Sequence, residues 1–200
     1  MPSSAEPESR PSLEELTAAS GYLAGVSAVV RSIGKARDVT RAVELLKDVT
    51  ARMGAEVSLF ASFMPDDASG IPYRLLLNCD PQWCTEYEEL TAHAEDPWLA
   101  YALTHSEPIR GSELDAHTEE QRGIVQLAHR FGFRSSIIVP TPSSGGLARM
   151  GVLFLGSSVP DYFEGDGYLV FKLVARSVAM EFHEWWLARI REELIANAAI

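Results

Sequence analysis

Four segments rich in strand-forming residues occur as two close pairs, and this arrangement constrains the fold more than any other feature. Residues 56–64 (EVSLFASFM) and 71–78 (IPYRLLLN) are separated by the turn-forming stretch PDDASG. Residues 136–141 (SIIVPT) and 149–155 (RMGVLFL) are separated by PSSGG. Because strands that are joined by short turns run antiparallel, each pair predicts a β-hairpin and the two hairpins predict an antiparallel sheet.

Segments with helical patterns lie before, between and after the hairpins. The expected helices are residues 12–36, 41–53, 98–103, 119–131 and 162–195, with a further short helix that begins at Asp80-Pro81. Ser12 and Glu15 form a capping-box pattern, while Gly21 and Gly25 leave open whether residues 12–36 are one bent helix or two. The order of elements predicts an α+β fold, a sandwich in which helices cover a central antiparallel sheet.

The length predicts one domain. Residues 1–11 are polar and rich in proline, so we expect a flexible N-terminal tail. Residues 12–200 are then expected to form a single core, because a chain of this length rarely divides into two stable cores.

The composition excludes several classes of function. The 200 residues have a formal net charge of −11 and their lysines and arginines are scattered, so we expect no direct contact with nucleic acid. No apolar run approaches the roughly 20 residues of a membrane span. Cys79 and Cys84, the only cysteines, are typical of reduced thiols in the cytoplasm. Because no metal-site spacing, nucleophile elbow or phosphate loop is present, we expect no metal, no cofactor and no enzymatic activity.

Between the hairpins lies a run of side chains that could recognise a polar group: Trp83, Tyr87, Asp96 and Pro97. Trp83 and Tyr87 are four residues apart, so they would share one face of a helix. Asp96 and Pro97 are a typical helix start, with Asp96 as the N-cap. An indole, a phenol and a carboxylate in a mostly apolar stretch could bind a small polar head group in a pocket. Alternatively, Asp96 only caps the helix and both aromatic rings belong to the core.

This run resembles the autoinducer-binding domain of LuxR-type quorum-sensing regulators. The shared features are the Trp-x3-Tyr-x8-Asp-Pro spacing, Pro108 after it, the Phe-Gly-Phe-Arg turn at residues 131–134 and the strand that ends at Pro140. The resemblance extends over about residues 12–185. It implies an α-β-α sandwich with a central five-stranded antiparallel sheet, and a function as a signal-binding domain in transcription regulation.

The resemblance also implies a ligand and its contacts. An N-acyl-homoserine lactone would lie between the sheet and the helices. Trp83 would donate to the lactone carbonyl, Asp96 would accept from the ligand amide, and Tyr87 would line the head-group side. An amide N–H is a suitable partner for a buried carboxylate, because an unpaired buried charge is costly.

Five positions depart from the family pattern. Cys79 stands where the family often has a tyrosine that bonds the acyl carbonyl, Gly111 where it has a second tryptophan, and Ser136 where it has a glycine. Phe154 lies near a family serine or threonine. Trp98 stands where a small aliphatic residue is usual, and we expect it to refill the volume left at Gly111, provided that it does not lie in solvent. The candidate ligand-binding residues are therefore Trp83, Tyr87, Asp96, Trp98, Cys79, Gly111 and Phe154, and the signal could be a related small amphipathic molecule.

Apolar residues recur every seven positions along the expected helix at 162–195, and they include Leu173 and Met180. Up to about residue 182 we expect this stripe to pack on the sheet. Beyond that point the helix would overrun a domain of roughly 30 Å, and five apolar residues would need cover: Trp185, Trp186, Leu187, Ile190 and Leu194. A homodimer is the expected cover.

No helix-turn-helix pattern follows before Ile200, so we expect no DNA-binding domain in this chain, which is then either a separate sensor module or a fragment. A second function stays open beside signal binding. The protein could act without a ligand, by forming a heterodimer with a full-length LuxR-type regulator and inhibiting it.

Overall fold

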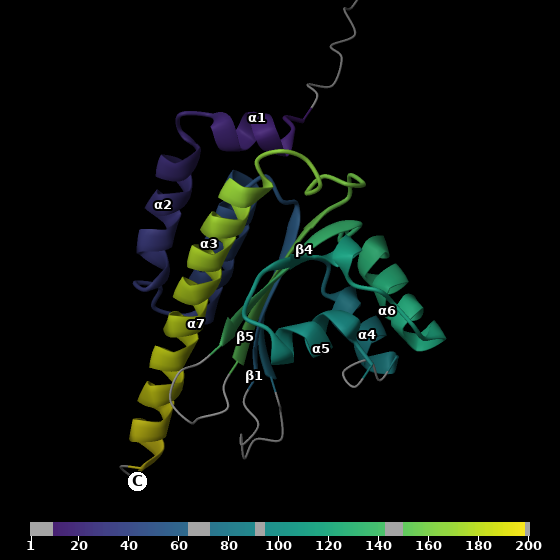
Figure 1. Ribbon diagram of the computed structural model, residues 1–200. Helices are drawn as coiled ribbons and strands as arrows, with labels where there is room; N and C mark the ends of the chain where they lie inside the picture. Colours follow the sequence, from purple (N-terminus) through teal and green to yellow (C-terminus); the bar gives the residue numbers. More distant parts are fainter. Residues whose placement is uncertain (1–9, 64–72, 91–94, 143–149, 199–200) are drawn as a thin grey trace, which may run out of the picture.

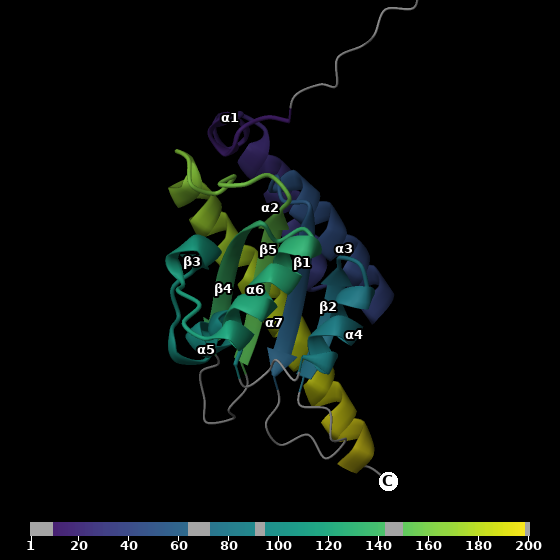
Figure 2. The same ribbon diagram turned by 90° about the vertical axis from the view of Figure 1, so that its right-hand side faces the viewer.

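The computed structural model of the protein describes residues 10–63, 73–90, 95–142 and 150–198. These residues form an antiparallel sheet with helices on both faces. The last helix is long and runs along one face of the sheet (Figures 1 and 2). The predicted α+β sandwich is therefore confirmed, together with its long C-terminal helix.

The sheet contains five strands in the order β2-β1-β5-β4-β3. Their bounds are β1 Val57–Phe63, β2 Tyr73–Asn78, β3 Ile109–Arg110, β4 Ser135–Pro142 and β5 Met150–Ser157. β1 pairs with β2 and β4 with β5, as the two hairpins require, and β1 also pairs with β5. β3 is too short to produce a sequence pattern. The turns expected at residues 65–70 and 143–146 lie outside the described residues.

Helices cover the two faces in separate groups. Their bounds are α1 Leu13–Ala18, α2 Tyr22–Ile33, α3 Val39–Arg52, α4 Gln82–Glu89, α5 Pro97–Thr104, α6 Glu119–Arg130 and α7 Tyr168–Ala198. α1, α2, α3 and α7 lie on one face, and α4, α5 and α6 lie on the other (Figure 2). Residues 12–36 form two helices, and Ser12 with Glu15 forms the predicted capping box at the start of the first.

Alternation of side chains along the strands divides the interior into two cores. Phe60 and Leu153 belong to the core beneath α2, α3 and α7. Their strand neighbours Leu59 and Val152 point the other way and join the core beneath α5 and α6. The ligand site expected from the sequence belongs to this second core, because Trp83 and Trp98 pack there.

The long helix α7 begins at Tyr168 instead of Tyr162. Asp161 and Gly167 have positive φ angles of 56° and 89°, which a right-handed helix cannot contain. The predicted packing of the apolar stripe on the sheet is wrong for Leu173 and Met180, which are 60% and 39% exposed. The side chains that α7 buries are instead Phe171, Ala175, Val178, Ala179 and Phe182.

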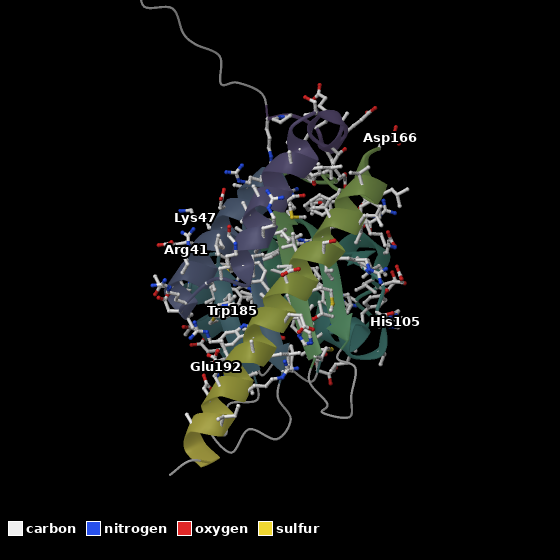
Figure 3. The ribbon with its side chains drawn as sticks, turned by 90° about the vertical axis from the view of Figure 1, so that its left-hand side faces the viewer. Arg41, Lys47, His105, Asp166, Trp185 and Glu192 are labelled. Carbon is white, nitrogen blue, oxygen red and sulfur yellow. The ribbon has the colours of Figure 1, made fainter. Side chains whose placement is uncertain are left out.

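The apolar residues near the end of α7 are covered by the same chain. Four of them are at most 7% exposed: Trp185, Trp186, Leu187 and Ile190. The Trp185 indole donates to the Ala36 carbonyl over 2.9 Å, and Figure 3 shows Trp185 on the side of α7 that faces α2 and α3. Arg74 lies over the ring of Trp186. These four residues need no second subunit to cover them. The homodimer therefore stays a prediction, and the contacts expected for it are made within the chain instead. The side chain of Leu194, the fifth residue, lies outside the described part of the structure.

A small polar cluster is buried beneath α7. Ser62, Gly151 and Thr141 are register neighbours on β1, β5 and β4. The hydroxyls of Ser62 and Thr141 and both ring nitrogens of His183 have no hydrogen-bond partner among the described residues. Gly151 provides the room for His183, because an added Cβ would lie 2.8 Å from His183 Nδ1 and 2.4 Å from Thr141 Oγ1.

Replacing Gly151 by alanine tests this close packing. The new methyl group would overlap Thr141 and Phe60 as well as His183, so Gly151→Ala should lower the free energy of unfolding by roughly 1–3 kcal/mol. Gly123→Ala in α6 is the matched control, because an added Cβ there meets no atom within 4 Å and alanine favours the helix by about 1 kcal/mol. Denaturant unfolding measures both variants, and an unchanged stability of Gly151→Ala would contradict the packing.

His183 should also make folding stability depend on pH. Burial lowers the pKa of His183 from its ordinary value of 6.5, and Glu184 opposes this shift. The unfolded chain therefore binds a proton more readily than the folded one, so stability is full above a pH of about 6.5 and falls as the pH decreases. His183→Gln should reduce that loss in urea unfolding. His117→Gln, at an exposed histidine, is the control, and an unchanged pH dependence in His183→Gln would refute the prediction.

Candidate functional site

A pocket lies between the sheet and helices α4, α5 and α6. It spans about 700 Å³ of atom-free space, which includes the part that is open to solvent. The strands contribute Leu59, Ala61, Phe63, Tyr73, Leu75 and Phe154; the helices and the residues beside them contribute Trp83, Cys84, Tyr87, Asp96, Trp98, Leu99, Ile124, Ala128 and Phe133. Because most of this lining is apolar, a ligand that fills the pocket needs a substantial apolar part.

Trp83 and Tyr87 share one face of α4, as their spacing predicts. Asp80 helps to start this helix, because its carboxylate accepts from the Gln82 backbone N–H over 2.9 Å. The Trp83 and Tyr87 rings stack with centroids 4.6 Å apart and planes inclined by 23°. Stacking fixes the two rings relative to each other, and both line the pocket.

Asp96 connects α4 to α5. Its Oδ1 accepts from the backbone N–H groups of Trp98 and Leu99 over 2.8 and 3.2 Å. Its Oδ2 accepts from the Tyr87 hydroxyl over 2.7 Å. Asp96 is therefore the N-cap of α5, as one alternative expected, and it is also the only carboxylate among the described residues that line the pocket.

The other titratable groups of the pocket remain neutral at physiological pH. Burial raises the pKa of Tyr87 far above its ordinary value, and the charge of Asp96 and the hydrogen bond to it raise it further. Burial and the hydrogen bond to Glu88 raise the pKa of Tyr73 to about 12. Burial also raises the pKa of the Cys84 thiol. Tyr87 is thus a hydrogen-bond donor, and Cys84 is not a thiolate nucleophile.

Two indole N–H groups in the pocket lack an acceptor. The Nε1 atoms of Trp83 and Trp98 are buried and have no hydrogen-bond partner among the described residues. Leaving a buried donor unpaired costs roughly 1–3 kcal/mol, and native structures rarely accept that cost without a reason. Both residues line the pocket, and the Trp83 donor is the candidate partner for an incoming molecule because the N–H edge of Trp98 lies toward Gly111.

Trp98 is buried and packs beside Gly111, the position at which the sequence comparison with the family expects a tryptophan. It is 6% exposed, and its Cζ2 lies 3.3 Å from where a Cβ of Gly111 would be. Ser136 Oγ lies 2.1 Å from the same point, so neither alanine nor a larger residue fits at 111 without a shift. Trp98 also stacks on Phe154 at 6.3 Å. Its burial meets the condition stated for Trp98 to refill the volume at Gly111.

The structure brings together five of the seven predicted site residues: Trp83, Tyr87, Asp96, Trp98 and Phe154. Cys79 and Gly111 are described but do not line the pocket. Cys79 packs at the edge of the second core, where burial raises the pKa of its thiol to about 12. Apart from Phe154, sequence reasoning missed the strand residues of the lining. The sequence contained a signal for three of them, because Leu59, Ala61 and Phe63 are two residues apart along β1 and so share one face of the sheet.

Neither a metal-holding cluster nor a membrane-spanning helix occurs in the described part of the chain. No group of histidine, cysteine, aspartate or glutamate side chains there is arranged to hold a metal ion. No helix there is both long enough and apolar enough to cross a bilayer.

Several solved structures share this fold. The N-acylhomoserine lactone dependent LuxR family transcription factor CepR2 of Burkholderia cenocepacia superposes with a TM-score of 0.72 at 15% identity, over 86% of this chain and 99% of that chain. SdiA of Escherichia coli gives 0.67 at 12% identity, over 86% and 70%. The ligand-binding domain of VqsR from Pseudomonas aeruginosa gives 0.57 at 11% identity, over 84% and 97%. At such low identity these similarities show the fold alone.

Sequence comparison identifies the family. No curated protein matches the sequence. The family model of the autoinducer binding domain, however, matches residues 38–184, which include both hairpins, the pocket and the sheet-facing half of α7. The chain therefore belongs to the autoinducer-binding domain family, the signal-binding regulatory domain of LuxR-type regulators.

Proposed function

We propose that the protein binds an N-acyl-homoserine lactone, or a related small amphipathic acylated signal, in the pocket beneath α4, α5 and α6. It would act in transcription regulation in the cytoplasm. The observation that carries the proposal is the Trp83 indole N–H, which is buried in an apolar pocket without an acceptor. A ligand carbonyl at this point would remove the cost of the unpaired donor.

The other polar groups suggest how such a ligand would lie. Asp96 accepts hydrogen bonds, so it favours a ligand N–H on the side of the pocket where Tyr87 already donates to it. The apolar strand residues Leu59, Ala61 and Leu75 would contact the acyl chain. A ligand with a compact polar head and an apolar tail therefore matches a lining that has polar groups on the helices and apolar residues on the strands.

Two of the similar structures support a class of ligand, acylated molecules with a small polar head, and do not single out one compound. CepR2 is named as dependent on an N-acylhomoserine lactone, and SdiA has been solved in complex with octanoyl-rac-glycerol. Both compounds join an acyl chain to a small oxygen-rich head. The glycerol ester has no amide N–H, so the two heads differ in the group that Asp96 would recognise.

The alternative is a ligand-independent protein that forms a heterodimer with a full-length LuxR-type regulator and inhibits it. That function needs a pocket filled by the chain's own side chains. Trp98 occupies part of the volume, but the pocket is still lined by Trp83, whose buried indole donor has no acceptor among the described residues. An unpaired donor on a pocket-lining residue favours ligand binding, because a self-filled pocket would be expected to satisfy it.

Thermal unfolding with a panel of ligands tests the proposal. The panel contains acyl-homoserine lactones of several chain lengths and octanoyl glycerol. A ligand at 100 times its Kd should stabilise the protein by about 2.7 kcal/mol. If none of these compounds raises the Tm, the proposed function fails, and co-purification with a full-length regulator would then support the interaction alternative.

Trp83→Phe should weaken binding without removing any hydrogen bond from the unliganded protein. The change keeps an aromatic ring and deletes the unpaired N–H, so we expect the Kd to rise roughly tenfold. Trp186→Phe is the matched control, because Trp186 also carries a buried, unpartnered indole N–H but lies in the other core. Titration calorimetry measures both. Equal affinities of Trp83→Phe and the wild type would exclude Trp83 as a ligand donor.

Asp96 is a less specific probe, because its carboxylate is also structural. Asp96→Ala removes a helix cap, worth about 1 kcal/mol, and also removes the acceptor of the bond that the buried Tyr87 hydroxyl donates, which costs roughly 1–3 kcal/mol more. Asp38→Ala is the control, because Asp38 caps α3 through the Arg41 N–H at an exposed position. Chemical denaturation should show the larger loss for Asp96→Ala, and equal losses would contradict the role of the Tyr87 bond.

A further inference from the structure

One short segment of the chain, residues 107–114, contacts both the pocket side of the sheet and helix α7. This edge segment contains β3 and the 3-10 helix η2 Gly111–Glu113, and β3 pairs with β4 at one edge of the sheet (Figure 2). α5 lies on one face of the sheet and α7 on the other. From the edge, the segment reaches both helices.

On the pocket side, the edge segment packs against α5. The Tyr101 hydroxyl of α5 donates to the Glu107 carbonyl over 3.0 Å. Ile109 packs on the core beneath α5 and α6. Trp98 Cζ2 lies 3.3 Å from the point where a Cβ of Gly111 would be. Because Trp98 also lines the pocket, its ring lies between the pocket and the edge segment.

On the other side, the edge segment is bonded to the start of α7. One oxygen of the Glu107 carboxylate accepts from Arg176 Nη1 over 2.8 Å, and the other lies 3.2 Å from Lys172 Nζ. The guanidinium carbon of Arg110 lies 4.7 Å from the centroid of the Tyr168 ring. All three α7 partners belong to the first turns of that helix.

Tight packing at Gly111 makes the edge segment a stiff connection. Ser136 Oγ lies 2.1 Å from the Cβ position of Gly111, so no side chain fits there without a shift. Protein interiors are packed as densely as organic crystals and transmit strain. A displacement of the Trp98 ring toward Gly111 would therefore move the edge segment, and with it the Glu107 and Arg110 side chains that contact α7.

We propose that the edge segment couples filling of the pocket to the start of α7. A molecule in the pocket would press the Trp98 ring toward Gly111, and the edge segment would then hold its ion pairs with α7 more firmly. The inference rests on the proposed function only because a ligand must fill the pocket; it does not depend on which polar head that ligand carries. Coupling between two sites is reciprocal, so loss of the contacts with α7 should also weaken ligand binding.

Hydrogen–deuterium exchange of α7 tests the coupling. The probe is N-octanoyl-homoserine lactone, or octanoyl glycerol if that ester gives the larger thermal shift. In the wild type, a saturating probe should slow exchange in residues 172–180 roughly threefold more than in α3, which reports the general stabilisation by the ligand. Glu107→Gln weakens both ion pairs with α7, so it should abolish this additional slowing. It should also raise the Kd by roughly twofold to fivefold, because exposed ion pairs are weak.

Two further variants show whether the edge segment is responsible. Glu193→Gln is the matched control, because it weakens the ion pair between the other end of α7 and Arg74 on β2, and the additional slowing should persist. Glu107→Lys combined with Arg176→Glu reverses the pair and should restore the slowing. Equal slowing in the wild type and Glu107→Gln, or a bound probe that slows α7 no more than α3, would overturn the coupling and leave the proposed function intact. No binding of either probe to the wild type would overturn both.

Discussion

The Asp96 carboxylate is the group on which the arrangement of the pocket depends. It accepts from two backbone N–H groups of α5 and from the Tyr87 hydroxyl of α4, so one buried charge fixes two helices relative to each other. A buried carboxylate is tolerated only when donors surround it, and here they come from both helices. Stacking on Tyr87 then holds Trp83, and the helix start holds Trp98. The site is therefore pre-organised before any ligand arrives, which lowers the cost of binding.

The two faces of the sheet carry similar apolar residues, but only one face lines the pocket described above. Beneath α7, Phe60 packs on Phe182 with centroids 5.9 Å apart. Beneath α5 the interior is a pocket, although strand alternation supplies equally apolar side chains. An unpaired indole N–H occurs on both faces, in Trp186 and in Trp83. Trp83 lines the pocket and Trp186 does not, so a molecule in the pocket could satisfy only the Trp83 donor.

Much of this architecture could be predicted from local sequence. Both strand pairs, the capping box at Ser12 and the shared face of Trp83 and Tyr87 follow from periodicity and capping preferences. The cover of Trp185 could not be predicted, because it depends on the carbonyl of Ala36, far away in the sequence. The bond from Tyr87 to Asp96 likewise needs the tertiary approach of two helices, so spacing indicated the cluster but not the dual role of the carboxylate.

The central claim is that the Trp83 indole group in the pocket binds the ligand, and nitrogen-15 NMR of the tryptophan side chains tests it most directly. The chain has four tryptophans, so the indole N–H signals can be assigned with single Trp→Phe variants. Titration with N-octanoyl-homoserine lactone should move the signal of Trp83 downfield, as a new hydrogen bond forms. The signals of Trp185 and Trp186, which pack in the other core, should stay in place. Binding that leaves the Trp83 signal unchanged would contradict the account.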